Sequence, residues 1–259
     1  MEPLDSFRNN IYSQNGEDGV IAEIIKRMGL EPKEGFWCVE FGAWDGVHLS
    51  NTFALVESCS AMAVYIEGDR KKYELLSQTA KKFPSITPVE ALVVGSLQTS
   101  DGLPNSSFGN VEIATLDQIL ARTSCPKDYD LLSIDIDSND LEVWEAHREY
   151  RPKIVVIEIN SSLAPGVFQR HGRDRLGNSF SSTLEVARSK GYSAACHTGN
   201  LIFVRDDLVH FLEMEESYIK RPESLFDRSW LLANASPGQR IAEKVVRLIF
   251  GPKNELGSA

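Results

Sequence analysis

Residues 40–46 read EFGAWDG and directly follow the apolar run FWCV at 36–39. The apolar run predicts a buried strand over 35–43, and the two glycines predict a tight turn at its end. A glycine-rich turn lets the backbone come close to another group. Glu40 and Asp45 would repel a phosphate there, so the stretch predicts a turn that binds a different kind of ligand.

The rest of the chain alternates between strand and helix patterns. Apolar runs predict further strands over 61–69, 86–95, 129–137 and 153–160. Apolar residues at helical spacing predict helices over 17–30, 50–59 (capped by Ser50 or Asn51), 70–83, 116–124, 140–150 and 181–191. YSAACH, TGN and LIFVRDD read as a hairpin, whose short turn joins antiparallel strands.

This alternation predicts an α/β fold of the Rossmann-like type. We expect a three-layer sandwich with a mostly parallel seven-stranded sheet and one late antiparallel strand. An N-terminal helical arm (1–33) precedes the core (34–207), and a C-terminal helical extension (208–259) packs on the same domain.

Composition excludes some classes of partner. The chain has 259 residues and a formal net charge of -10, which argues against nucleic-acid binding. No run of 18 apolar residues exists, so we expect no membrane partner. The four cysteines form no CxxC pair, and the polar start has no signal-peptide pattern, so the expected location is cytoplasmic. Homo-oligomerisation is left open.

The expected ligand site lies at the carboxyl ends of the parallel strands, near the point where the strand order reverses. A nicotinamide dinucleotide needs GxGxxG, whereas this turn has GxxxG with an acid beside it. A carboxylate suits a cation or an ammonium group. Glu67 ends the second strand, where it can accept hydrogen bonds from ribose hydroxyls. A ribose and an ammonium without a pyrophosphate describe S-adenosylmethionine.

Five stretches resemble class I S-adenosylmethionine-dependent methyltransferases, and within them the FkbM-like family. The stretches are YSQNGEDGVI (12–21), VEFGAWDGVHLSNT (39–52), VYIEGD (64–69), LLSIDIDSND (131–140) and GYSAACHTGNLIFVRDD (191–207). The resemblance spans about residues 10–207 and leaves the helical tail uncovered. After the fourth strand the family often has D-x-E-G-x-E where this chain has DIDSND, a departure on the substrate side.

The resemblance implies a set of cofactor contacts. Glu40, Gly42 and Gly46 would form the loop beneath the methionine part of the cofactor, and Ser50, Asn51 and Thr52 would lie near its carboxylate. Gln14, in the N-terminal arm, would cover the same end. Glu67 would hold the ribose hydroxyls, and Ala91 and Leu92 would flank the adenine. Simpler interpretations stay open. In these interpretations the two glycines serve only to form the turn, and Gln14 serves only to cap the first helix.

Oxygen-bearing side chains end the fourth and fifth predicted strands: Asp135, Asp137, Glu158 and Asn160. If these strands are neighbours, the four side chains converge. Asp135, Glu158 and Asn160 could then hold Mg²⁺, with Asp135 catalytic and Asp137 near the substrate. Alternatively, the aspartates cap the next helix and Glu158 pairs with an arginine.

The long segment 161–180 is expected to close over the acceptor. Its Arg170 and Arg173 would favour an anionic or hydroxyl-rich acceptor, unless the loop is merely solvated. His171 and His197 are candidate bases, because histidine titrates near neutral pH. His197 closes an apolar run, which equally favours a structural role.

The resulting hypothesis is O-methylation of a small hydroxylated acceptor, such as a sugar or natural-product intermediate, with a divalent metal as one option. N- or C-methylation by the same fold is an alternative, as is a non-catalytic S-adenosylmethionine-binding partner protein. A nicotinamide dehydrogenase is disfavoured by the missing middle glycine.

Overall fold

An eight-stranded sheet forms the centre of the computed structural model, which describes residues 1–30, 35–97, 111–136 and 139–233. The strands are β1 (Trp37–Phe41), β2 (Met62–Glu67), β3 (Ile86–Val93), β4 (Glu112–Ala114), β5 (Leu131–Ile134), β6 (Ile154–Glu158), β7 (Tyr192–His197) and β8 (Asn200–Arg205). Their order is β4-β3-β2-β1-β5-β6-β8-β7. Only β8 runs against its neighbours, so the predicted single antiparallel strand is confirmed.

The predicted strand number, seven, is wrong. The additional strand, β4, has three residues and pairs in parallel with the end of β3. So short a segment leaves no periodic pattern to recognise in the sequence.

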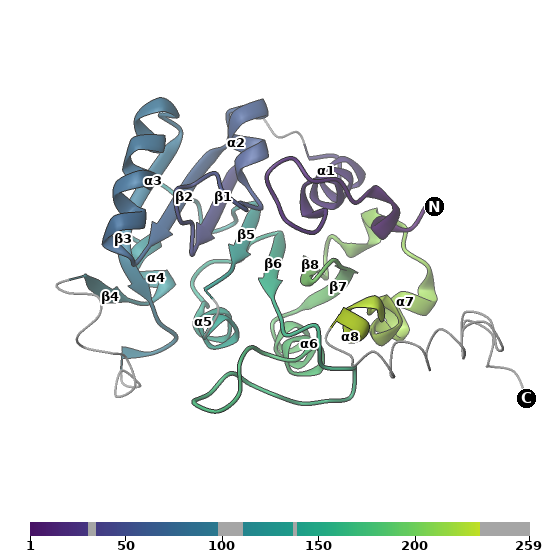
Figure 1. The fold of residues 1–259 in the computed structure, drawn as a ribbon. Helices are drawn as coiled ribbons and strands as arrows, with labels where there is room; N and C mark the ends of the chain where they lie inside the picture. Colours follow the sequence, from purple (N-terminus) through teal and green to yellow (C-terminus); the bar gives the residue numbers. More distant parts are fainter. Residues whose placement is uncertain (31–34, 98–110, 137–138, 234–259) are drawn as a thin grey trace, which may run out of the picture.

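Helices cover both faces of the sheet, which confirms the three-layer architecture. Figure 1 shows α1 (Glu17–Arg27), α2 (Phe53–Cys59) and α3 (Arg70–Lys82) on one face, and α5 (Asp140–Ala146) and α6 (Phe180–Ser189) on the other. The remaining helical segments are η1 (Leu4–Phe7), α4 (Leu116–Leu120), η3 (Val209–Leu212), α7 (Glu216–Lys220), η4 (Pro222–Leu225) and α8 (Ser229–Ala233). In the described ranges, no helix is long and apolar enough to cross a membrane.

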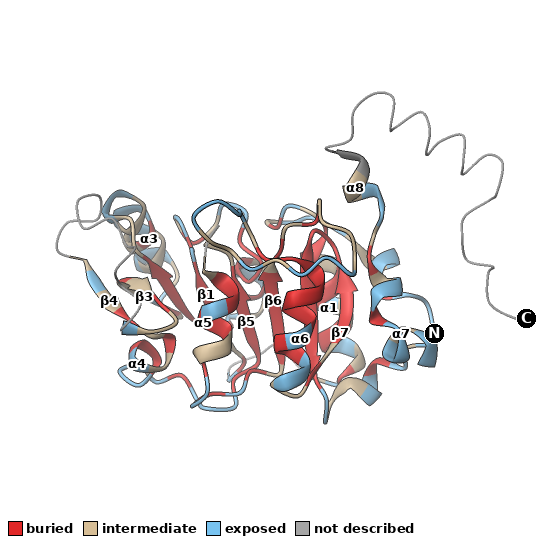
Figure 2. Ribbon diagram, turned by 90° about the horizontal axis from the view of Figure 1, so that it is seen from below, coloured by how far each residue is buried: buried red, intermediate tan, exposed pale blue. Residues whose placement is uncertain are grey.

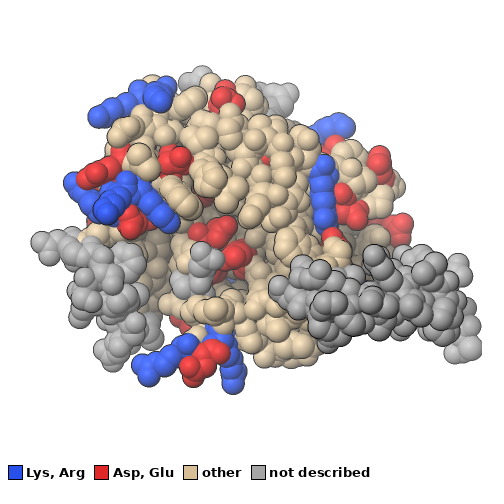
Figure 3. Space-filling model, in the orientation of Figure 1, with Lys and Arg blue, Asp and Glu red and all other residues tan. Residues whose placement is uncertain are grey.

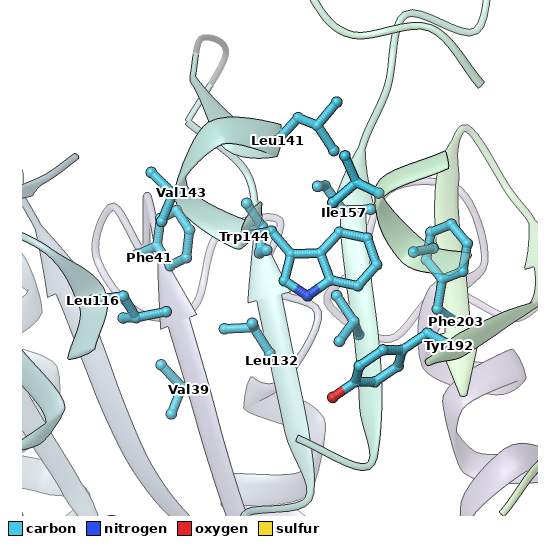
Figure 4. Packing of buried hydrophobic residues seen from close by; sticks show 14 of the residues in the cluster. Val39, Phe41, Leu116, Leu132, Leu141, Val143, Trp144, Ile157, Tyr192 and Phe203 are labelled. Atoms are coloured by element: carbon cyan, nitrogen blue, oxygen red, sulfur yellow. The ribbon is translucent and has the colours of Figure 1, made fainter. Parts of the chain in front are cut away.

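Alternating side chains of each strand supply two hydrophobic cores. Val39 and Phe41 of β1 face the core under α5 and α6, whereas Cys38 faces the core under α1 to α3. Figure 2 shows the central strands buried, whereas β4 at the edge and the outer helix faces are exposed. Trp144 of α5 fills the first core, with its ring centroid 5.2 Å from that of Phe203 and 5.6 Å from that of Tyr192 (Figure 4).

The arm and the tail both attach to the β7–β8 hairpin. The carboxylate of Glu17 accepts hydrogen bonds from Thr198 Oγ1 (2.7 Å) and Asn200 Nδ2 (3.2 Å). Arg8 donates to the His197 carbonyl at 2.6 Å and pairs with Asp227 of the tail at 3.2 Å. The division into arm, core and extension remains a prediction.

The strand order reverses between β1 and β5. From β1 the chain moves to β2 and β3 on one side, and it returns to β5 and β6 on the other. The crevice beyond the carboxyl ends of β1 and β5 is where an open α/β sheet binds its ligand.

Candidate active site

A cavity of about 520 Å³ lies at this reversal point. Its walls come from the loop after β1, the ends of β5 and β6, the hairpin turn, the N-terminal arm and the C-terminal tail. The lining residues are Leu49 and Asn51; Asp135, Asp140, Glu158, Ile159, Asn160, Ser161, Ser162, Leu176 and Gly177; Gly199 and Asn200; Gln14 and Asn15; and Trp230. Gln14 and Asn51 are therefore the two predicted cofactor contacts that reach this cavity.

Three other predicted contacts bind one another. The buried carboxylate of Glu40 accepts hydrogen bonds from the hydroxyls of Ser50 (2.7 Å) and Thr52. Burial raises the pKa of Glu40. Ser50 Oγ also accepts the N–H of Phe53 at 3.0 Å, although the N-cap of α2 is Thr52 and not the predicted Ser50 or Asn51. Glu40, Ser50 and Thr52 fix the start of α2 on β1 and do not line the cavity.

The two glycines of the turn have steric reasons to be glycine. Gly42 and Gly46 have φ of 77° and 81°, in the left-handed region. A Cβ on Gly42 would overlap the carbonyl oxygen of Asp135, and a Cβ on Gly46 would lie 2.8 Å from Leu76 Cδ1. Neither residue lines the cavity. The non-glycine residues Trp44 and Leu49 also have positive φ (50° and 57°), a strain that often marks functional loops.

The predicted ribose and adenine residues lie beside this loop. Glu67 is buried and accepts the N–H groups of Trp44 and Asp69, each at 2.8 Å. Ala91 is buried in β3, and Leu92 packs against Gly68. Glu67, Ala91 and Leu92 are thus on adjacent strands, but outside the 520 Å³ cavity.

The predicted convergence of Asp135, Glu158 and Asn160 occurs, because β5 and β6 pair with Ile134 opposite Ile157. Asp137 lies outside the described residues. The carboxamide of Asn160 holds its own loop: Oδ1 accepts from the N–H and Oγ of Ser162, and Nδ2 donates to the Leu176 carbonyl. Among the residues that the structure describes, no three His, Cys, Asp or Glu side chains form a metal-binding group. Magnesium therefore stays a prediction.

The loop after β6 does not bring its cations to the cavity. Arg170 pairs with Glu145 of α5 at 2.7 Å, and Arg173 is exposed. His171 Nδ1 accepts the Gly177 N–H at 3.3 Å within the loop. None of the three lines the cavity, so their predicted roles in substrate binding and proton transfer are not supported.

His197 makes the contacts of a structural residue and does not line the cavity, so its predicted role as a base is not supported. Its Nδ1 accepts the N–H of Asp227 at 2.9 Å. Its Nε2 lies 2.9 Å from Ser161 Oγ. The Ser161 hydroxyl donates its hydrogen to the Gly199 carbonyl, so Ser161 Oγ must accept from His197, and Nε2 carries the proton. The ring stacks on Phe226 and is 1% exposed, and burial lowers its pKa to about 4.

This burial predicts a pH-dependent stability. In the unfolded chain His197 takes up a proton near its ordinary pKa of 6.5, whereas the folded protein resists protonation down to about 4. The unfolded state therefore binds more protons as the pH falls from 6.5 to 4, and the lost stability is on the order of 3 kcal/mol.

We expect His197→Gln to remove this part of the pH dependence, measured by urea unfolding at intervals from pH 4 to 7.5. His210→Gln, at an exposed histidine, is the matched control and should follow the wild-type curve. A wild-type slope that survives in His197→Gln would assign the effect to another group.

The sequence did not reveal several lining residues. Trp230 lies in the tail, where no motif marks it, and Asn200 reads only as a turn residue of the TGN sequence. Both reach the cavity through long-range contacts: Asn200 is held by Glu17, and the Trp230 ring packs on Gly199, where a Cβ would lie 2.7 Å from the indole.

No family model matches the chain, and no curated protein matches it. Solved structures that it resembles include a precorrin-6y C5,15-methyltransferase from Geobacter metallireducens GS-15, at 13% identity, 78% coverage of this chain, 98% of that chain and a TM-score of 0.42. A SAM-dependent methyltransferase from Aquifex aeolicus is 10% identical, with coverages of 70% and 85% and a TM-score of 0.38. TYW2 from M. jannaschii, in complex with AdoMet, is 15% identical, with 76% of this chain and 79% of that chain covered and a TM-score of 0.38. At these identities and TM-scores the similarity carries no argument about function.

Proposed function

We propose that this protein is an S-adenosylmethionine-dependent methyltransferase of the FkbM-like kind, acting on a hydroxyl of a small acceptor. The supporting observation is the cavity at the strand-order reversal, lined by carboxylates and carboxamides beside a strained glycine turn. Four of the five sequence stretches that resemble the family contribute residues to this cavity, and the fifth, VYIEGD (64–69), contains Glu67.

The residues present fit this cofactor better than a dinucleotide. Glu40 and Glu67 are buried at the ends of β1 and β2, where a pyrophosphate would meet negative charge. A carboxylate offers about four acceptor positions, and each Glu67 oxygen uses one for a backbone N–H. Glu67 therefore retains acceptors for two ribose hydroxyls, and Asn51 and Gln14 would hold the methionine end.

The bound cofactor would supply an activated methyl group, so the chain has to align the acceptor and remove a proton. Asp135 and Glu158 are the carboxylates at the ends of β5 and β6 in the cavity. One of them would accept the proton that the acceptor hydroxyl loses on methylation. Transfer to nitrogen or carbon would use the same alignment.

Binding is the direct test of the cofactor. We expect calorimetric titration to show binding of S-adenosylmethionine and none of NAD. Asn51→Leu removes the amide that Nδ2 anchors to Ser133 Oγ at 3.1 Å. It should weaken S-adenosylmethionine binding by about fivefold, since one hydrogen bond to the cofactor contributes about 1 kcal/mol.

Asn9→Leu is a useful control, because Asn9 is exposed and does not line the cavity. It should bind like the wild type once folding is verified. Binding of NAD but not of S-adenosylmethionine would refute the proposal. Binding of S-adenosylmethionine without methyl transfer to any acceptor would favour the alternative of a non-catalytic S-adenosylmethionine-binding partner protein.

A further inference from the structure

A second cavity, of about 320 Å³, lies at the opposite end of the sheet from the active-site cavity, and we call it the basic pocket. Residues at the end of α5, before β6, at the end of α6 and at the start of β7 enclose it. In the described part of the chain, the two cavities share no lining residue. The basic pocket is therefore a separate site, at the amino ends of the parallel strands.

Three cations line the basic pocket with little compensation. They are Arg148, Arg151 and Lys190. Glu145 is the only acidic residue among the described lining residues, and it is paired with Arg170 at 2.7 Å. Within the described ranges, the hydrogen bonds of Arg148 and Arg151 involve only their backbone groups. In a chain with a net charge of -10, such a cluster indicates a place for an anion.

The active-site cavity has the opposite charge. Figure 3 shows acidic side chains in a central hollow of the face drawn there, with Lys and Arg toward its edges. None of the described residues that line the active-site cavity is Lys or Arg. An anion therefore meets a more favourable potential in the basic pocket than in the active-site cavity.

Lys190 carries the effect of this crowding of positive charge. Its Nζ donates to the His147 carbonyl at 2.6 Å, which caps the end of α5 but uses only one of three N–H donors. Burial, together with the two neighbouring arginines, lowers the pKa of Lys190 to about 8, although Asp117 and Glu145 act in the opposite direction. An anion in the pocket would offset the repulsion and accept the remaining donors.

The basic pocket also contains a buried donor without an acceptor. Trp144 is 0% exposed, and its Nε1 has no hydrogen-bond partner in the described part of the chain. Figure 4 shows this nitrogen on the side of the ring toward Tyr192, which also lines the pocket. The nitrogen is shielded from solvent, so it lies behind the cations, where a negative charge in the pocket would stabilise the N–H dipole.

We propose that the basic pocket binds the phosphate group of a small phosphorylated molecule. Each guanidinium of Arg148 and Arg151 offers a planar pair of donors that fits two phosphate oxygens, and the Lys190 ammonium adds a third charge. Three cations match a phosphate dianion better than the single charge of a carboxylate. This site is distinct from that of the proposed function, and the inference does not depend on that function.

Lys190 reports on the basic pocket even though the rest of the ligand is unknown. Competitive acetylation across neutral and alkaline pH, followed by peptide mass spectrometry, gives the pKa of individual lysines. We expect inorganic phosphate, compared with chloride at equal ionic strength, to raise the pKa of Lys190 by at least about one unit. Lys71 is exposed and lies outside the pocket, so it is the internal control and should not shift.

Two variants test whether the arginines hold the phosphate. Arg148→Gln and Arg151→Gln should each reduce the phosphate-induced shift at Lys190 by at least about half. In chloride alone, Arg148→Gln should raise the pKa of Lys190, because it removes a neighbouring positive charge. Arg175→Gln changes an exposed arginine that lines neither cavity, and it should leave both measurements at their wild-type values.

Acetate at the same ionic strength separates recognition of phosphate from general attraction of anions, and it should raise the pKa of Lys190 less than phosphate does. The shift with phosphate should also saturate as its concentration rises. An equal shift with acetate, no shift or an unsaturable shift with phosphate, or a full shift retained in both arginine variants would overturn the inference.

Discussion

Gly42→Ala is expected to destabilise the protein by about 4 kcal/mol. Alanine is strained at a φ of 77°, and its Cβ would overlap the carbonyl oxygen of Asp135, which belongs to the rigid end of a neighbouring strand. The backbone cannot relax there without separating β1 from β5. Urea unfolding at pH 7 gives the free energy of unfolding for comparison with the wild type.

Gly29→Ala separates strain from overlap. Gly29 also has positive φ (64°), but a Cβ there would meet nothing within 4 Å. It should cost only about 1 kcal/mol, the strain alone. A similar loss in both variants would mean that the close approach of Gly42 to Asp135 is unimportant.

Glu67→Ala is expected to lower the affinity for S-adenosylmethionine by at least about a hundredfold. The carboxylate holds the turn through Trp44 and Asp69, and under the proposed function it also accepts two ribose hydroxyls. Charge-assisted hydrogen bonds contribute about 1.5–3 kcal/mol each, so two lost bonds account for this factor. Calorimetric titration measures it.

Glu90 provides the control for this variant, because it lies directly opposite Glu67 in the β2–β3 register. Its carboxylate faces Arg70 at the surface, so Glu90→Ala should leave cofactor affinity unchanged. Equal affinity in Glu67→Ala and Glu90→Ala would remove Glu67 from the cofactor site.

The histidines and arginines show where interpretation of the sequence reaches its limit. A histidine at a hairpin turn fits both a base and a buried structural group, and only the contacts of His197 with Ser161, Asp227 and Phe226 distinguish them. Likewise, the sequence of an arginine-rich loop does not show whether its arginine side chains point toward a predicted site or away from it. Arg170 points away because Glu145 of α5 lies within ion-pair distance.

The sequence by itself determined the order of strands and helices along the chain except for β4, the single antiparallel strand and the meeting of Asp135 with Glu158. These features follow from local periodicity, from the short hairpin turn and from the rule that carboxyl ends of parallel strands share one edge. Tertiary structure alone decided that Ser50 and Thr52 bind Glu40, that His197 is buried and that Trp230 completes the cavity. Hydrogen-bond partners and packing contacts join residues as far apart as Glu17 and Asn200, and such pairing depends on how the layers are placed in space, which no local pattern records.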